Sequence, residues 1–502
     1  MSRGGADGWS TGFVEASARP IHRSRVRHEC AEPSASLGRL RRCFDRFRSG
    51  TSAGERAIAP TPRRTAAMDR PGRDPLRLGP LIGEVAMNRR AFLHLSASSV
   101  ALPSALGGCG GAEDPKPLVE SPPEAELVEA TVSKGPWVTI LGPGTVRLRF
   151  ETFEDVAVPV VIHVDDTRSE LVTTTSTTNV AWAWGYEDAP TEEDLPGEYT
   201  LHDIIIDGIP TGATLEWEVQ VTGLPAGSCR PNPAPSDPIT VCWIADTMYP
   251  KSESVAANAL LMAPDLLLHG GDFQYSSSPT DTWTSMFANL APLLRSTVFQ
   301  VCIGNHEFDG DVETSQMYDR LFSGQGSSDE RWHAFTYGPV HILMLDSESG
   351  DLTDPAGAQA AWADSALSAA VAEGLIPIIA FHRPTYSLSK HWRSDTTLRD
   401  TIHELAVRHG VQIVFSGHVH GYERFVVDGI HYVVDGGGGA LTYDLEEAFE
   451  EVEELRPGES DLRQVAERTH GCVELIVDAG SVFVNRINED GETTDSFSFP
   501  TG

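Results

Sequence analysis

Short apolar runs alternate with helical patterns through the second half of this 502-residue chain. Runs rich in Val, Ile, Leu and Phe are typical of strands that are buried on both faces of a sheet. They occupy residues 241–245, 266–269, 298–303, 341–345, 376–381, 411–415 and 431–434. Helical stretches lie between several of them, at residues 254–262, 358–373 and 396–409. Strands that alternate with helices predict an α/β domain with a largely parallel core sheet.

Nearly every strand in this predicted sheet is followed by a side chain that can bind a metal. These side chains are Asp246, Asp272, Asn305, His382, His418 and His420. A single Asp after a strand is usually a helix cap, and a lone buried His usually belongs to the core. Five such sites in chain order are hard to reconcile with coincidence. Because ligands bind at the carboxyl ends of strands in an open α/β sheet, we expect these groups to converge on one crevice.

The order of these groups along the chain resembles that of a known family. Asp246, Gly271-Asp272-x-x-Tyr275, Gly304-Asn305-His306-Glu307, His382 and Gly417-His418-x-His420 follow one another as in the calcineurin-like metallophosphoesterases. The tyrosine points to the purple acid phosphatase branch, and the resemblance spans roughly residues 128–500. It implies an α/β metallophosphoesterase domain, with a β-sheet core flanked by helices. It also implies a small all-β, fibronectin type III-like sandwich before that domain.

The resemblance also implies a pair of metals. Asp246, Tyr275 and His420 would hold the first metal, Asn305, His382 and His418 would hold the second, and Asp272 would bridge them. Anionic oxygen ligands at the first site suit Fe(III), and the imidazole and amide ligands of the second suit divalent Zn, Fe or Mn. Such a pair would bind the phosphoryl oxygens and supply hydroxide from a bridging water. The chain departs from the branch at Met248, where a small residue is usual, and Met248 would crowd the first metal.

Two further histidines resemble residues on the phosphate side of the family's site. His306 matches the position that contacts the substrate phosphate, and His391 lies nine residues beyond His382. Imidazole titrates near the working pH, so either could protonate the leaving alkoxide. We interpret His306 as a phosphate contact and His391 as the proton donor. The alternative for His391 is a surface loop residue without a role.

The first half of the chain divides into segments of different composition. Residues 1–86 hold 16 Arg, no Lys and 9 acidic residues without periodicity. They predict a disordered extension, which is either a basic arm or the product of a wrong start site ahead of Met87. Residues 87–109 resemble a twin-arginine signal that ends in a lipoprotein box, with Cys109 as the lipid-bearing residue. The protein is therefore expected to be exported to the periplasm or cell surface and anchored to the membrane only through Cys109.

Four more segments follow the predicted signal. Residues 110–127 form a Pro-rich tether, 128–224 the β-sandwich, 225–238 a Pro-rich linker and 239–502 the catalytic domain. Beyond residue 86 the chain holds 22 basic and 63 acidic residues. A body of this charge argues against nucleic acid as a partner, because phosphate backbones require clustered cations. Any phosphate chemistry must therefore depend on strong local positive charge.

The function that the resemblance implies is hydrolysis of small-molecule phosphate monoesters. One alternative is a phosphodiesterase or nucleotidase of the same superfamily, because the loops that would exclude diesters have no sequence signature here. The other is a non-catalytic, metal-binding surface lipoprotein in which the sandwich carries the function. The oligomeric state has no signature in the sequence.

Overall fold

The structure is a computed structural model that describes residues 125–165, 168–174, 179–180, 199–273, 283–307, 316–326, 331–391, 393–445, 454 and 456–501. The Arg-rich extension, the signal, most of the tether and Tyr275 lie outside these residues. Within the described ranges, no helix has both the length and the apolar character needed to cross a bilayer.

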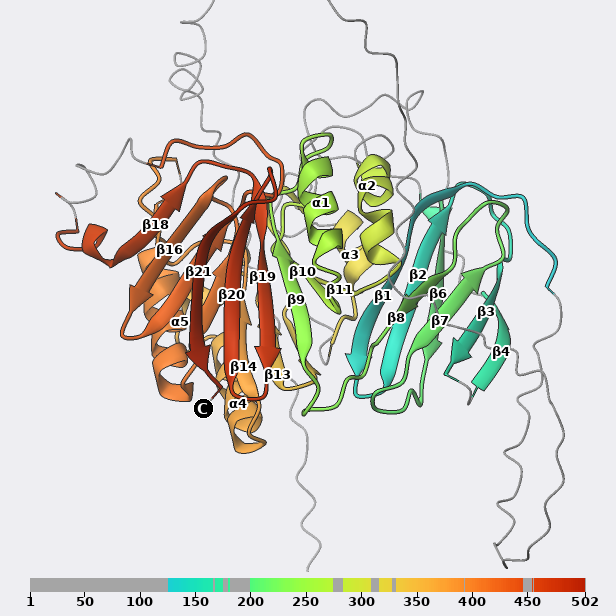
Figure 1. Cartoon of the computed structure of the whole chain (residues 1–502), viewed down its shortest axis with the longest axis horizontal. Coiled ribbons are helices and arrows are strands. Elements are labelled where there is room, and N and C mark those ends of the chain that lie inside the picture. Colours follow the sequence, from blue (N-terminus) through green and yellow to red (C-terminus); the bar gives the residue numbers. More distant parts are fainter. Residues whose placement is uncertain are drawn as a thin grey trace, which may run out of the picture. The chain divides into compact units, whose positions relative to one another are not determined.

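The described strands form three sheets (Figure 1). The largest has the spatial order β21 (Thr493–Pro500), β20 (Ser481–Asn488), β19 (Gly471–Asp478), β9 (Ile239–Ile244), β10 (Leu266–His269), β11 (Val298–Val301), β1 (Val132–Gly142), β2 (Thr145–Thr152), β6 (Tyr199–Ile206) and β5 (Asn179–Val180). The second has the order β12 (His333–Tyr337), β13 (Val340–Met344), β14 (Ile376–Ala380), β15 (Ile413–Ser416), β17 (Ile430–Asp435), β16 (Tyr422–Val427) and β18 (Arg463–Glu467). The third has the order β4 (Arg168–Thr173), β3 (Pro159–Val164), β7 (Leu215–Val219) and β8 (Gly227–Cys229).

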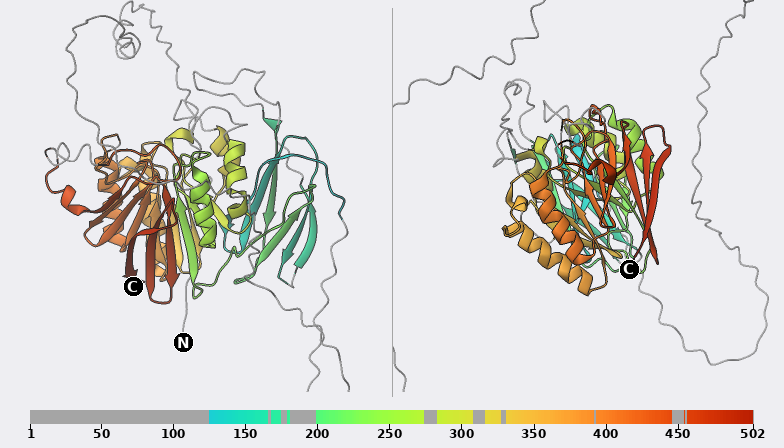
Figure 2. Two further views of the ribbon diagram at one scale, coloured as in Figure 1. Left: turned by 45° about the horizontal axis from the view of Figure 1, so that its top comes forward. Right: turned by 90° about the vertical axis from the view of Figure 1, so that its left-hand side faces the viewer.

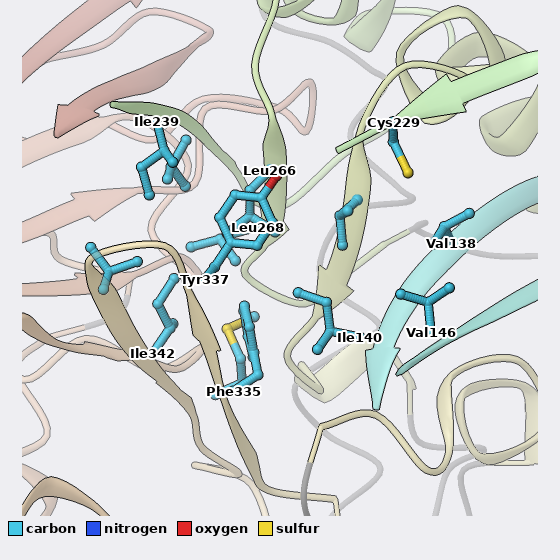
Figure 3. Close-up of a cluster of buried hydrophobic side chains, with 14 of the residues drawn as sticks. Val138, Ile140, Val146, Cys229, Ile239, Leu266, Leu268, Phe335, Tyr337 and Ile342 are labelled. Atoms are coloured by element: carbon cyan, nitrogen blue, oxygen red, sulfur yellow. The ribbon is translucent and has the colours of Figure 1, made fainter. Parts of the chain in front are cut away.

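Two of these sheets pack face to face in the second half of the chain. Trp243 and Leu268 of the largest sheet share a buried core with Ile378 and Phe415 of the second. The Trp243 and Phe415 rings stack with their centroids 5.2 Å apart. Figure 3 shows part of this core, including Leu268. The predicted single, largely parallel sheet is thus two mixed sheets, whose parallel centres are β9-β10-β11 and β13-β14-β15-β17.

Helices cover the outer faces of the two stacked sheets (Figures 1 and 2). The described helices are α1 (Ser252–Leu261), α2 (Thr284–Leu294), α3 (Gln316–Phe322), α4 (Ala358–Ala372) and α5 (Thr396–His409). Side chains of α1 and α2 pack on Ile244 and Leu267 of the largest sheet. Side chains of α4 and α5 pack on Leu343 and Ile379 of the second sheet. The predicted α/β core flanked by helices is therefore confirmed.

The N-terminal strands form a small antiparallel sandwich. Strands β1, β2, β6 and β5 make one layer, β4, β3, β7 and β8 make the other, and Leu148 and Trp217 lie in the buried core between them. β1 also pairs with β11 in parallel, through Val138 and Val298, so one layer of the sandwich continues into the α/β part of the largest sheet. Strand β8 lies within residues 225–238, which the sequence assigns to a linker. The predicted domain boundaries themselves stay predictions.

Candidate metal centre

The loops that follow five parallel strands carry the candidate metal ligands. Asp246 and Asp272 follow β9 and β10, and Asn305 begins the short 3-10 turn after β11. His382 follows β14, and His418 follows β15. The first three strands belong to the largest sheet and the last two to the second sheet. The ligands therefore meet where the carboxyl ends of both stacked sheets lie side by side, and both sheets are needed to assemble them.

Four candidate metal-ligand atoms lie close together. The Nε2 atom of His382 lies 3.0 Å from Nδ1 of His418, 3.2 Å from Oδ1 of Asn305 and 3.4 Å from Oδ2 of Asp272. Asp272, His382 and His418 are buried, and their ligand atoms all lie within 4.8 Å of one another. The Nδ1–H of His382 donates to the carbonyl oxygen of Gly270 at 2.8 Å, which fixes the ring so that Nε2 faces the other donors.

A second donor pair lies next to this group. Oδ1 of Asp246 is 3.4 Å from Nε2 of His420, while Oδ2 of Asp246 accepts the backbone N–H of His418 at 2.7 Å. The Nδ1–H of His420 donates to the carbonyl of Leu441 at 2.9 Å, so Nε2 faces Asp246. Tyr275, which the sequence adds to this pair, lies outside the described residues.

Tyr443 contacts His420, and the sequence did not predict this contact. Its ring stacks on that of His420, with centroids 4.1 Å apart and planes 14° apart. Its hydroxyl oxygen lies 3.4 Å from the His420 Nε2. Tyr443 follows His420 by 23 residues and belongs to no motif, so only the fold brings the two rings together.

The backbone at these ligands adopts a conformation that non-glycine residues rarely occupy. Asp246, Asp272 and His418 have φ angles of 59°, 50° and 67°. Each left-handed residue of this kind costs on the order of 1–3 kcal/mol, and such residues concentrate at functional sites. Two glycines make room for the carboxylates. A Cβ on Gly304 would lie 2.4 Å from Oδ1 of Asp272, and one on Gly417 would lie 2.5 Å from Oδ2 of Asp246.

Glu307 holds two of the loops together. Its Oε2 accepts the backbone N–H groups of Asp272 and Gly304 at 2.8 and 2.7 Å, and its Oε1 accepts that of Phe273 at 2.7 Å. This buried carboxylate therefore joins the loop after β10 to the turn after β11. The sequence pattern included Glu307 in the motif that contains Asn305 but gave it no role.

The electrostatics of the group favour bound positive charge. Burial lowers the pKa of His382, but the carboxylates of Asp272, Asp246 and Glu348 outweigh it and raise that pKa to about 10. Burial raises the pKa of Asp272, but His382, His306 and His418 outweigh it and hold that pKa far below its usual range. Burial and the charge on His382 lower the pKa of His418. A proton on His382 thus lies where the converging donors would hold a cation.

The donor set suits a metal ion. Imidazole nitrogens, an amide oxygen and a carboxylate oxygen are ligands that transition metals accept together. The other three donor atoms lie 3.0 to 3.4 Å from the His382 Nε2, and two of the three ligand histidines fix their rings by donating N–H to a carbonyl. The residues of the site therefore fit the metal centre that the sequence predicts.

The two predicted phosphate-side histidines lie differently. The backbone N–H of His306 donates to Oδ1 of Asp272 at 2.8 Å, and the His306 ring, 37% exposed, has its Nε2 3.9 Å from Oδ2 of the same residue. His391 is exposed, and its ring lies 4.8 Å from that of Tyr443. The structure thus brings His306 directly to the ligands and His391 only to Tyr443. Met248 is 37% exposed and so is not packed into the buried ligand group.

Residues 243–422, which include all the predicted ligands, match the family of calcineurin-like phosphoesterases. This segment of the chain is therefore related to the calcineurin-like phosphoesterases.

Curated proteins that are similar to this chain are purple acid phosphatases. It is 30% identical over 176 residues to purple acid phosphatase 15 of Arabidopsis thaliana, covering 32% of each chain. It is 30% identical over 220 residues to purple acid phosphatase 1 of Ipomoea batatas, covering 39% of this chain and 44% of the relative. A protein named probable inactive purple acid phosphatase 9, also from Arabidopsis thaliana, is 27% identical over 198 residues, which cover 32% of this chain and 30% of that protein. The matched segments cover 30% to 44% of the length of these relatives, so the homology is distant.

Two solved structures share the fold of this chain. Purple acid phosphatase PPD1 from seeds of yellow lupin (Lupinus luteus) superposes with a TM-score of 0.60 at 18% identity, covering 73% of this chain and 74% of that one. PhoD superposes with a TM-score of 0.53 at 13% identity, covering 75% of this chain and 92% of PhoD. The predicted arrangement of a small β-sandwich before an α/β metallophosphoesterase core is therefore confirmed.

Proposed function

We propose that the chain hydrolyses phosphate monoesters at a dinuclear centre of Fe(III) and a divalent metal, which is Zn, Fe or Mn. The observation that carries the proposal is the convergence of Asp272, Asn305 and His418 on the Nε2 of His382, at 3.0 to 3.4 Å. The neighbouring pair of Asp246 and His420 supports a second metal. Fe(III) rests on the resemblance carried by Tyr275.

The residues divide between holding the metals and handling the substrate. Bound metals would supply Lewis acidity and activate a water for attack on phosphorus. Asn305, His382 and His418 would hold one metal, Asp246, Tyr275 and His420 would hold the other, and Asp272 would be shared by both. Their local charge would let a protein with a formal net charge of −34 bind a phosphate.

Two histidines would act on the substrate. The His306 ring, which is 37% exposed beside Asp272, would donate to a phosphate oxygen. His391 would protonate the leaving oxygen, since imidazole gives up a proton near neutral pH. The contact of His391 with Tyr443, which stacks on His420, supports its nearness to the centre.

His418→Ala tests the proposal. Loss of its Nδ1 removes a ligand, so we expect hydrolysis of 4-nitrophenyl phosphate to fall by orders of magnitude and the metal content to drop by one ion per chain. His403→Ala is the matched control, because His403 lies on α5 and contacts Asp428 and Tyr432 away from the ligands. Wild-type turnover in His418→Ala would contradict the whole scheme.

The same assay separates the alternatives. Faster turnover of bis(4-nitrophenyl) phosphate than of the monoester would favour a phosphodiesterase. Absence of turnover with both metals loaded would favour a metal-binding surface protein, an outcome for which the relative named probable inactive gives a precedent.

Tyr275→Phe tests the identity of the first metal. A phenolate bound to Fe(III) absorbs visible light, so we expect the wild-type protein to be coloured and the variant to lose the band. The visible spectrum of protein purified without added metal measures this. An unchanged spectrum would refute Fe(III)–Tyr275 ligation and leave the phosphoesterase proposal standing.

We also propose that the protein is exported and lipid-anchored at Cys109, on the basis of its sequence signal alone. Cys109→Ala should release the protein from membranes to the soluble fraction. Retention of the variant in the membrane fraction would refute the anchor.

A further inference from the structure

A cavity of about 340 Å³ opens beside the candidate metal centre. Its lining consists of Arg383, Pro384, Arg393, Ser394, Asp395, Thr396 and His418. His418 is one of the four converging donors, so the cavity and the centre share a wall. A substrate whose phosphate lay at the centre could therefore extend its leaving group into this cavity.

The lining is basic, although the chain as a whole is acidic. It holds two arginines and one acid, Asp395, whose Oδ1 accepts the backbone N–H groups of Thr397 and Leu398 at the start of α5. Elsewhere in the described part of the chain, a cavity of about 520 Å³ is lined by Asp237, Glu373 and Asp478 without any lysine or arginine. The positive lining is thus a local property of this cavity.

Arg383 is held in place at the boundary between cavity and centre. Its Nε and Nη2 donate to Oε2 of Glu348 at 2.8 and 2.7 Å, which leaves Nη1 directed elsewhere. That Nη1 lies 3.4 Å from Nε2 of His418. If Nδ1 of His418 serves as a metal ligand, Nε2 carries the ring proton, and both atoms are then donors. An anionic group beside them can accept from both.

We propose that this cavity binds a second anionic group, a carboxylate or a further phosphate, on the leaving group of the substrate. The inference rests on the proposed function, because it names the class of phosphomonoester that the centre would prefer. Arg393 and the Nη1 of Arg383 are the specificity-determining groups. Guanidinium groups suit this role because they donate paired hydrogen bonds to planar carboxylates and to phosphates.

The kinetic test compares metal-loaded protein on four substrates. They are phenyl phosphate, 4-carboxyphenyl phosphate, benzene-1,4-diyl bisphosphate and 4-(aminomethyl)phenyl phosphate. We expect the two anionic substrates to have the higher kcat/KM, and the larger of their two values identifies carboxylate or phosphate as the better ligand. In Arg393→Gln the ratio of anionic to neutral substrate should fall by about tenfold, the effect of one charge-assisted hydrogen bond.

Two further variants complete the experiment, one as a second test and one as a control. Arg383→Gln should shift the ratio in the same direction, since it removes the other guanidinium. Arg408→Gln removes the same charge from α5 at an exposed position paired with Asp364 and Glu404, twelve residues from Thr396 or about 18 Å along the helix. It should keep the wild-type ratio. Equal ratios in the wild type, Arg393→Gln and Arg383→Gln would overturn the inference, while turnover itself would uphold the proposed function.

A binding measurement keeps the two proposals separate. Calorimetric titration gives the Kd of metal-loaded protein for orthophosphate and for pyrophosphate, whose second phosphate can reach the cavity. The preference for pyrophosphate should fall by about tenfold in Arg393→Gln and not in Arg408→Gln. If this holds without turnover of any substrate, the cavity is an anion site and the proposed hydrolysis is wrong. An unchanged preference in Arg393→Gln overturns the cavity proposal, whatever the turnover.

Discussion

At the scale of single residues, the centre depends on a carboxylate that is not among its ligands. Glu307 is buried and accepts the N–H groups of Asp272, Phe273 and Gly304. A buried carboxylate is stable only where donors satisfy its oxygens, and here the donors are the backbone that carries Asp272. Glu307 therefore helps to fix the position of the Asp272 carboxylate.

Glu307→Gln should loosen this support. The amide NH2 replaces one acceptor oxygen and leaves a buried backbone N–H facing a donor, which costs about 1–3 kcal/mol. We expect the free energy of unfolding in urea to fall by that amount, and the metal content of the purified protein to fall with it. Glu373→Gln, at the exposed end of α4, is the control and should change neither quantity. Wild-type stability with full metal content in Glu307→Gln would refute the role.

At the scale of elements, His202 joins the two layers of the sandwich. From β6, its Nε2 contacts Oγ1 of Thr152 in β2 at 2.9 Å, and its Nδ1 contacts Oγ1 of Thr174, after β4, at 2.8 Å. The ring also stacks on Phe150, with centroids 4.3 Å apart. Burial lowers the pKa of His202 to about 4, against the opposing effect of Asp155 and Glu151. The sandwich is thus built around a neutral imidazole.

This histidine makes the stability of the fold depend on pH. Between pH 6.5 and 4 the unfolded chain binds a proton that the folded ring excludes, so unfolding becomes easier as the pH falls through this window. The contribution is at most about 1.4 kcal/mol per pH unit. In His202→Gln the free energy of unfolding should decline less steeply over this range, as measured by urea titration at several pH values. His163→Gln, on the partly exposed face of β3, is the control. Parallel declines in wild type and His202→Gln would contradict the prediction.

Some elements could be predicted from sequence because their signal is local. The bounds of β10 and α5 are those that the apolar pattern indicates, and α5 begins with the Asp395 cap and ends at Gly410 in the left-handed conformation. Helix α2 was missed, since Pro292 lies inside it and no side chain caps its start. Strands β19 to β21 were missed as well. They join the largest sheet through β19, which pairs antiparallel with β9, a strand more than two hundred residues earlier.

The candidate site, too, could be predicted from the sequence only in part. The positions of Asp246, Asp272 and His382 follow from strand ends, which a sequence displays. The presence of two sheets in place of one could not be predicted. A strand that is buried on both faces has the same apolar sequence pattern in either arrangement. The contact of Tyr443 with His420 depends on the path of a loop, which leaves no periodic signal.

At the scale of the whole molecule, β1 belongs to both halves of the described fold. One edge pairs with β2 in the sandwich and the other with β11 in the catalytic sheet. Trp137 of β1 packs on Phe287 and Phe322 of the helices α2 and α3, with centroids 5.0 and 6.1 Å apart. Arg149 of β2 donates to the carbonyl of Leu321 at 2.9 Å. The sandwich therefore closes part of the catalytic core.

A chain restricted to residues 239–502, the predicted catalytic domain, should not fold by itself. Because this fragment lacks β1, the edge of β11 and the apolar surface that Trp137 covers would be exposed. Exposed strand edges and apolar surface favour aggregation. We expect it to be insoluble, or to lack a cooperative thermal transition. A chain of residues 125–502 keeps every described strand and is the control. A soluble 239–502 fragment that unfolds cooperatively would instead support two independent domains.

The pairing of β1 with β11 also means that β1 is synthesised long before its partner strand. Val138 and Val298 are paired, yet a ribosome makes the second 160 residues after the first. At about 5–20 residues per second, the outer edge of β1 waits on the order of ten to thirty seconds for its partner. For that time the nascent sandwich exposes the unpaired backbone of β1. The pairing of this edge can be completed only when β9, β10 and β11 have been synthesised.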